Sequence, residues 1–163
     1  MKARILVLAL VVIAAFAGNA LATPIIGTIT AETARGALSE DLRLRSRFDN
    51  GASVKVFTRG AIEVITQRIV AEPGASFGWH SHPGENVNVV FQGTITLFHD
   101  EHCTEGITYE AGSAFSTSPD EIHLAHNPGT VPLILFATYF APLTTPLQAV
   151  RIDQPLPSPG CPA

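Results

Sequence analysis

The chain has 163 residues, of which 46% are hydrophobic and 15% are charged, and this length and apolar content suit one folded domain and exclude a disordered chain. Ten Lys and Arg stand against 14 Asp and Glu without any basic block, so nucleic acid is not expected as a partner. Thirteen Gly and 12 Pro predict frequent turns between short strands.

Residues 1–22 are typical of a secretory signal peptide. Two basic residues precede an uninterrupted apolar run over 5–17, which is too short for an ordinary membrane span, and Ala20-Leu21-Ala22 has the small-x-small pattern of a cleavage site. We expect a secreted or periplasmic mature protein of 141 residues with a net charge of −6, without a membrane segment after signal cleavage.

Residues 23–52 form an N-terminal extension whose local structure the pattern leaves open. The segment 37–48 fits a short helix, with Leu38 and Leu42 at helical spacing, or a strand in which arginines alternate with apolar residues. We interpret the arginine face as solvated and attach no function to it. Asp49-Asn50-Gly51 predicts a turn.

The expected barrel, residues 53–141, has a regular pattern of short apolar runs between turn residues. It predicts eight strands, at 53–58, 61–71, 87–91, 94–98, 107–109, 114–117, 122–125 and 132–140. Such even spacing favours a sandwich or barrel over a parallel sheet, which would need crossover helices. We predict an all-β fold with at most one short helix.

The C-terminal tail, residues 142–163, is too rich in proline for a helix or a central strand. It contains Cys161, and the only other cysteine is Cys103. Because export permits disulfides, we expect these two to pair, which would fix the tail and stabilise the fold by about 4 kcal/mol in the loop-entropy model. Two unpaired thiols remain the alternative.

Six histidines occur in the chain, and none precedes residue 80. His80 and His82 are two apart, so on a strand they project from the same face and can share one metal ion. His123 lies in another extended stretch and could complete the site if its strand lies opposite the first inside a barrel. Imidazole nitrogens suit Fe, Mn, Zn, Ni and Cu.

The other candidates have weaker cases. His99 and His102 are expected in the turn after a strand, as part of a solvated acidic loop or of a second metal site. His126, three residues after His123, is expected on the opposite face of the strand. Trp79 would pack under the site or form the rim of a pocket. A further residue, Asn127, is read as a turn-former that bonds its own backbone.

The spacing of eight residues is more specific than any of them alone: Gly74, His80, His82 and Gly93, then Gly112, Pro119, His123 and Asn127. This pattern resembles the two conserved motifs of the cupin family, over roughly residues 53–141. The resemblance implies a single jelly-roll β-barrel of about six to eight strands, with a divalent metal in its mouth.

The sequence departs from the cupin pattern where the family has a carboxylate ligand. That position falls on Asn86, whereas Glu85 lies one residue earlier. Strand parity places Asn86 inward, but a bulge after Pro83-Gly84 would bring Glu85 in instead. If neither binds, three histidines hold the metal, as in cupin-like thiol dioxygenases, and the additional positive charge favours anionic ligands.

Three classes of function follow from this reading. The first is a metal-dependent, dioxygenase-like oxidoreductase acting on a small organic substrate. The second is a non-catalytic cupin that binds a small molecule or a metal in the periplasm, and the third is a metal-free structural cupin. No nucleophile or second carboxylate near the motifs specifies a reaction, and a homodimer is left open.

Overall fold

The computed structural model describes residues 22–100, 103–158 and 161–162, so His102 and the expected signal peptide up to residue 21 lie outside the described residues. The described chain contains strands and one 3-10 helix, and none of its helices is long and apolar enough to span a membrane. The elements are β1 (Ile29–Leu38), β2 (Arg43–Arg47), β3 (Ser53–Phe57), β4 (Ile62–Ala71), β5 (Ser76–Ser81), β6 (Asn86–Gln92), β7 (Thr94–His99), β8 (Ile107–Glu110), β9 (Ala114–Thr117), β10 (His123–His126), β11 (Leu133–Pro142), the 3-10 helix η2 (Leu147–Val150) and β12 (Ile152–Asp153).

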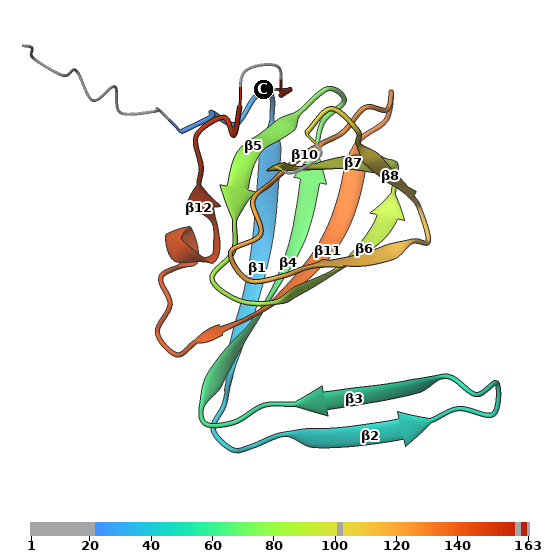
Figure 1. Cartoon of the computed structure of the whole chain (residues 1–163), viewed down its shortest axis with the longest axis vertical. Helices are drawn as coiled ribbons and strands as arrows, with labels where there is room; N and C mark the ends of the chain where they lie inside the picture. Colours follow the sequence, from blue (N-terminus) through green and yellow to red (C-terminus); the bar gives the residue numbers. More distant parts are fainter. Residues whose placement is uncertain (1–21, 101–102, 159–160, 163) are drawn as a thin grey trace, which may run out of the picture.

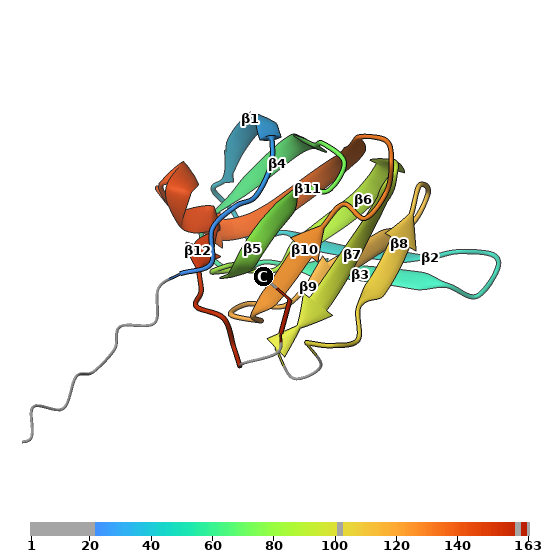
Figure 2. The same cartoon turned by 90° about the horizontal axis from the view of Figure 1, so that it is seen from above.

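Two five-stranded antiparallel sheets face each other and form the barrel (Figure 2). The first has the order β1-β4-β11-β6-β9, and the second has the order β12-β5-β10-β7-β8. Consecutive strands often lie in different sheets, as in a jelly roll, so the sheets are held together by chain crossings as well as by packing. The predicted all-β barrel is confirmed.

The core lies between the sheets because alternate side chains of each strand point inward. Its fully or nearly buried apolar side chains come from both layers and include Ile65, Leu133, Val90, Ile95 and Leu97. The alternation of β11 places every second residue of that strand in this core, and β4 contributes Ile65, Ile69 and Ala71 to it.

Strands β2 and β3 form a hairpin that projects away from the barrel (Figure 1). The segment 37–48, which fitted either a helix or a strand, is extended over Arg43–Arg47, and Leu44 pairs with Val56 across the hairpin. A strand satisfies this alternation because it collects the apolar residues on one face and the basic residues on the other. The strand expected at 53–58 is present, but it lies in the hairpin and not in the barrel.

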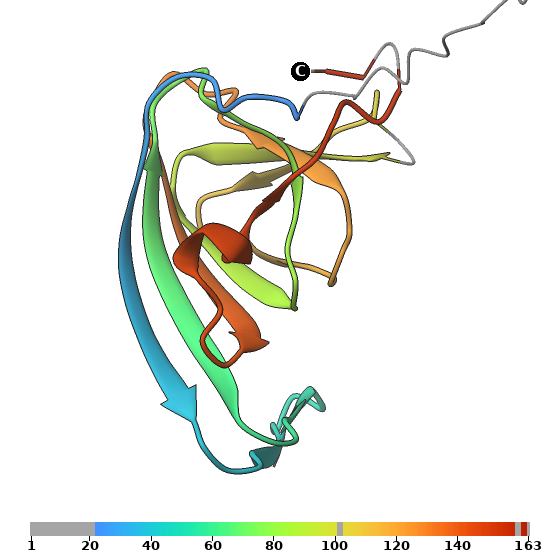
Figure 3. The ribbon, with the colours of Figure 1, turned by 90° about the vertical axis from the view of Figure 1, so that its left-hand side faces the viewer.

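The segment after β11 crosses the side of the barrel that faces the viewer in Figure 3. It forms η2 and then β12, which pairs with β5 and becomes the edge strand of the second sheet. The expected disulfide between Cys103 and Cys161 is present and closes a separation of 58 residues. The tail is therefore attached to the body at two places, by strand pairing and by a covalent bond.

Candidate metal centre

Three histidines meet inside the mouth of the barrel. His80 lies on β5, His82 follows the end of that strand, and His123 begins β10. One ring nitrogen of each lies within 4.8 Å of those of the other two, and all three residues are buried. The expected position of His123 was wrong in one respect: β10 is not opposite β5 but hydrogen-bonded beside it, with His123 directly paired to His80.

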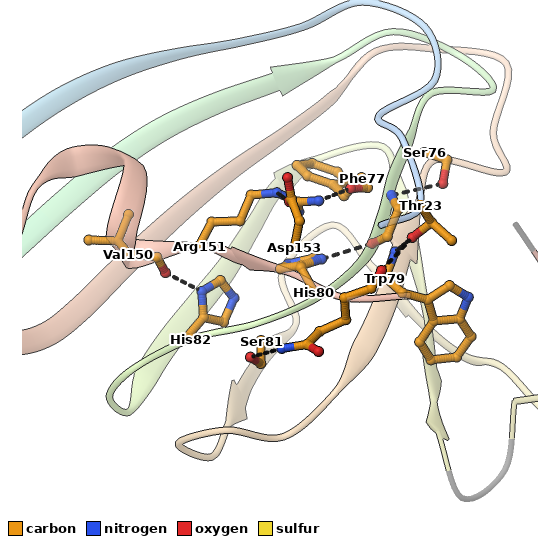
Figure 4. A network of polar contacts seen from close by, with 12 residues as sticks. Thr23, Ser76, Phe77, Trp79, His80, Ser81, His82, Val150, Arg151 and Asp153 are labelled. Carbon is orange, nitrogen blue, oxygen red and sulfur yellow. Dashed lines mark hydrogen bonds and ion pairs between the residues drawn. The ribbon is translucent and has the colours of Figure 1, made fainter. Parts of the chain in front are cut away.

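Each of these imidazoles is held through its Nδ1 atom by a backbone carbonyl. His80 Nδ1 donates to Gly78 O over 2.9 Å, and His82 Nδ1 donates to Val150 O over 2.6 Å (Figure 4). His123 Nδ1 donates to Glu121 O over 3.0 Å. A carbonyl only accepts, so the proton must be on Nδ1, and every Nε2 keeps its lone pair for a metal.

Burial keeps the three rings neutral. Desolvation is the main cause that lowers the pKa of His82 and of His123 to about 4, and it lowers the pKa of His80 well below its usual value. The mutual repulsion of the rings and the nearby Arg151 guanidinium act in the same direction for His80. Neutral imidazole is the form that binds a metal, so the ligand set is ready at neutral pH.

The fourth expected ligand position is occupied by an amide that points inward. Asn86 is 2% exposed and lines a small inner cavity of about 40 Å³ together with His80 and His123. Its Oδ1 accepts a hydrogen bond of 2.6 Å from Asn88 Nδ2. Glu85 is exposed on the outside of the barrel, and β6 pairs regularly with β9 from Asn86 onward, without a bulge that would turn Glu85 inward.

His99 is closer to the site than its sequence position suggested. It is the last residue of β7 and not part of the following turn, and it pairs across the sheet with His123, with ring centroids 6.5 Å apart. Its Nδ1 lies 2.6 Å from the Glu121 carboxylate. His126 lies on the opposite face of β10, as predicted, where it stacks on Phe98.

Trp79 does not contact the site, contrary to both readings of the sequence. It alternates with His80 on β5, so its side chain points to the outer face of the sheet, where it is completely buried against Leu124 and Cys161. Its Nε1 donates to Pro162 O over 2.7 Å. The tail that the disulfide attaches thus covers this indole.

Asn127 is more than a turn-former. Its side chain is completely buried and accepts from Gly129 N, as an Asx turn requires. Its Nδ2 also donates to Ala71 O and to Val131 O, which connects the turn to β4. The residue therefore supports the end of the sheet and does not face the histidines.

A cavity of about 220 Å³ adjoins the histidines. His80 and His82 contribute to its wall with Tyr139 and Arg151, and the remainder is largely apolar and comes from β1, β4, β5 and the C-terminal segment. Burial raises the pKa of Tyr139 to about 12, and its ring centroid lies 5.2 Å from that of His82. The phenol therefore remains protonated at neutral pH.

Sequence reasoning missed Tyr139 and Arg151. Tyr139 carried a weak signal, because it falls on the inward parity of a strongly alternating strand. Arg151 carried none, because it follows the barrel in a segment expected to be an irregular tail.

Comparison with known proteins places the site within a family. Residues 67–139 match the family model for the cupin domain. This part of the chain is a cupin domain. The match includes His80, His82, Asn86 and His123 but not the hairpin or the C-terminal segment. A search of the curated proteins found no match.

Several solved cupin structures are similar at low identity. An oxalate oxidase shares 16% identity over 49% of this chain and 46% of its own, with a TM-score of 0.42. The cupin 2 conserved barrel domain protein from Salinispora arenicola CNS-205 shares 21% identity over 49% of this chain and 64% of its own, with a TM-score of 0.43. The oxalate decarboxylase of Bacillus subtilis, which has Mn(II) centres, shares 23% identity over 47% of this chain and 21% of its own, with a TM-score of 0.41. The chain spans less than two thirds of each of these proteins, and neither activity nor substrate carries over at such identities.

Proposed function

We propose that this cupin is an exported metalloprotein that binds one divalent transition metal through Nε2 of His80, His82 and His123. We further propose that it acts on a small organic molecule in the adjoining cavity, as a dioxygenase-like oxidoreductase. One observation carries the proposal: three separate carbonyls fix the proton on the three Nδ1 atoms, so three neutral lone pairs remain in one buried cluster. Fe, Mn, Zn, Ni and Cu all accept such imidazole ligands.

The remaining groups suit binding and orientation of a substrate. Three protein ligands leave coordination positions open, and a bound metal would supply Lewis-acid or redox chemistry there. The protonated Tyr139 phenol can donate a hydrogen bond beside His82. Apolar side chains such as Ile69 and Phe77 line the cavity, and an apolar wall strengthens electrostatic interactions with a bound molecule.

A non-catalytic binding protein is the second candidate, and one observation favours it. No Asp or Glu lines the 220 Å³ cavity among the described residues, so no carboxylate is in place there as a general base. A cupin of this kind would hold the same metal and a small molecule without turning it over.

Metal analysis followed by an oxygen assay tests the two candidates. Protein purified without a tag from an exporting host should contain about one metal ion per chain, and His123→Ala should abolish this stoichiometry. His126→Ala is the matched control, because this histidine lies on the other face of the same strand. A wild-type protein without metal would support the metal-free structural reading and overturn the proposal.

The oxygen assay then separates enzyme from binder. The metal-loaded protein is given a panel of small acids, thiols and phenols in an oxygen electrode. Consumption that disappears in His123→Ala supports the oxidoreductase. Ligand binding without consumption supports the non-catalytic candidate instead.

Export is part of the proposal. Thr23, the expected first residue after cleavage, is 9% exposed, and its backbone N–H donates to Gln154 O over 3.0 Å. A terminal ammonium group at Thr23 would retain this donor. The intact mass of the exported protein should therefore lack residues 1–22, and a membrane-bound form that retains them would contradict export.

A further inference from the structure

Arg151 has a buried N–H donor from which no described group accepts a hydrogen bond. Its Nε lies 2.7 Å from Asp153 Oδ1, and its Nη2 donates to Phe77 O over 2.5 Å (Figure 4). Its Nη1 is buried and has no hydrogen-bond partner in the described part of the chain. Because a guanidinium cannot lose its proton at neutral pH, this unpaired donor is a cost unless a ligand accepts from it.

Strand pairing and a backbone hydrogen bond on either side of Arg151 hold this donor beside the histidines. Residue 151 precedes β12, whose pairing with β5 sets Asp153 opposite His80. The preceding carbonyl, Val150 O, accepts from His82, so one short segment positions both a metal-site histidine and the guanidinium. Arg151, His80 and His82 line the same cavity.

The rest of that cavity has a different chemistry. Its other walls include Ile25, Ile29, Ile69, Phe77 and Leu147. Arg151, beside His80 and His82, forms one cationic region of this cavity, and the apolar side chains form its other sides. No acidic side chain lines it among the described residues, so the positive charge there is balanced only by Asp153 behind the guanidinium.

We propose that the cavity binds a small organic monocarboxylate with an apolar body. Its carboxylate accepts from Arg151 Nη1, because guanidinium and carboxylate form charge-assisted hydrogen bonds, and its alkyl or aryl part packs against the apolar walls. The placement of this carboxylate next to the metal rests on the proposed function, whereas its recognition by Arg151 does not.

Calorimetric titration tests this with benzoate and hexanoate against their uncharged counterparts, benzamide and hexanol. Arg151→Gln removes the charge but keeps an amide donor. We expect it to weaken binding of both carboxylates at least tenfold and to leave the two uncharged probes unchanged. The matched control, Arg68→Gln, lies on β4 with its side chain outside this cavity, near Glu32, and should bind all four probes as the wild type does.

The titrations are run with metal-free protein and with zinc-loaded protein. Arg151-dependent carboxylate binding in both forms supports the inference even if the purified protein contains no metal and the proposed function fails. The inference is overturned if neither carboxylate binds to the wild type, or if Arg151→Gln binds them with unchanged affinity. Circular dichroism of the variant confirms that it is folded.

A second observation concerns the outer face of the first sheet, which is apolar and exposed. Val87, Val89, Phe91 and Phe136 project from it and are 37% to 65% exposed. They are adjacent, since Phe136 pairs with Val89 and its ring lies 5.9 Å from that of Phe91. A contiguous apolar patch of this kind marks an interaction site on a soluble domain.

The projecting hairpin has the opposite charge to the rest of the molecule. Residues 43–59 contain five basic residues and one acidic residue, whereas the remaining chain from residue 22 onward contains three basic and 13 acidic residues. The hairpin is also two-faced: Leu44, Val54 and Val56 share one side, and the basic side chains share the other. Such an arm is complementary to the acidic body of another molecule.

We infer that the partner is a second copy of this chain, with the two outer sheet faces packed together and each hairpin lying along the other body. Such an arrangement closes by twofold symmetry, because each copy supplies both surfaces. The apolar faces supply most of the affinity, and the charges set the register.

Sedimentation measurements test the dimer. At micromolar concentration the wild type should be a dimer, and Phe91→Ser with Phe136→Ser should make it a monomer. Leu156→Ser is the control, because Leu156 is as exposed as Phe136 but lies in the C-terminal segment. Replacing Arg43, Arg45 and Arg47 by Ser should also weaken the dimer, most strongly at low salt. A monomeric wild type, or a dimer that survives the double change, would overturn the inference.

Discussion

Asn86 determines the charge of the candidate metal centre. It is buried beside His80 and His123, and its amide takes the inward position where the family pattern has a carboxylate. A divalent ion held by three neutral imidazoles would therefore keep its full charge. With a metal bound as we propose, this one residue would favour an anionic ligand at the atomic scale.

Asn86→Glu should tighten binding of a divalent metal at least tenfold, since a carboxylate adds a charged oxygen donor at the inward position. Competition with a chelating dye measures the change. Glu85→Gln is the control and should have no effect, because Glu85 is exposed on the outer side. Weaker binding in Glu85→Gln with no change in Asn86→Glu would show that the carboxylate, and not the amide, faces the metal.

The C-terminal segment supports the site from outside residues 67–139. η2 presents Val150 O to His82, the next residue is Arg151, and β12 then pairs with β5. Beyond β12 the segment includes Cys161 of the disulfide and Pro162, whose carbonyl accepts from Trp79 Nε1. The segment is short and proline-rich and has little regular secondary structure of its own, so its order comes from hydrogen bonds to β5, such as Gln154 N–H to Trp79 O over 2.9 Å, and from the covalent attachment.

Replacing Cys103 and Cys161 together by Ser should lower the free energy of unfolding by about 2–4 kcal/mol. It should also weaken metal binding, because a loosened segment holds the Val150 carbonyl less firmly against His82. Urea unfolding and metal titration measure the two effects. Unchanged metal affinity in a destabilised variant would show that the site does not depend on the tail.

At the scale of the whole molecule, the buried histidines link stability to pH. In the folded protein the pKa of His82 and of His123 is about 4, whereas the unfolded chain has the ordinary value of 6.5. As the pH falls below 6.5, the unfolded state takes up protons that the folded state does not. In the metal-free protein the stability contributed by these two histidines is therefore fully present above pH 6.5 and is lost as the pH falls toward 4.

This loss should approach about 1.4 kcal/mol per pH unit for each such histidine once the unfolded state is protonated. Urea unfolding of the metal-free protein at pH 7.5, 6.0 and 5.0 measures it. His82→Asn should make the dependence less steep, because one of the shifted groups is gone. An equal slope in the variant would contradict the assignment of the effect to the buried rings.

Local patterns in the sequence determined much of this molecule. Turn residues at short intervals and alternating apolar residues determine the all-β class, because strands have a period of two whatever their partners are. The spacing of His80 and His82, together with His123 at its motif position, predicted the histidine cluster. The inward position of Asn86 could be predicted for the same reason, and two cysteines can form only one pair within a chain.

Tertiary structure alone decided the arrangement around that cluster. Which strand lies beside β5 depends on pairing between distant segments, so the sequence did not show that β10 and β12 flank it, that Trp79 faces away from the site, or that His99 lies beside His123. It also did not reveal Arg151, because nothing local distinguishes a half-buried guanidinium from a solvated one. Burial is a property of the whole fold, and only the fold brings residue 151 to the histidines.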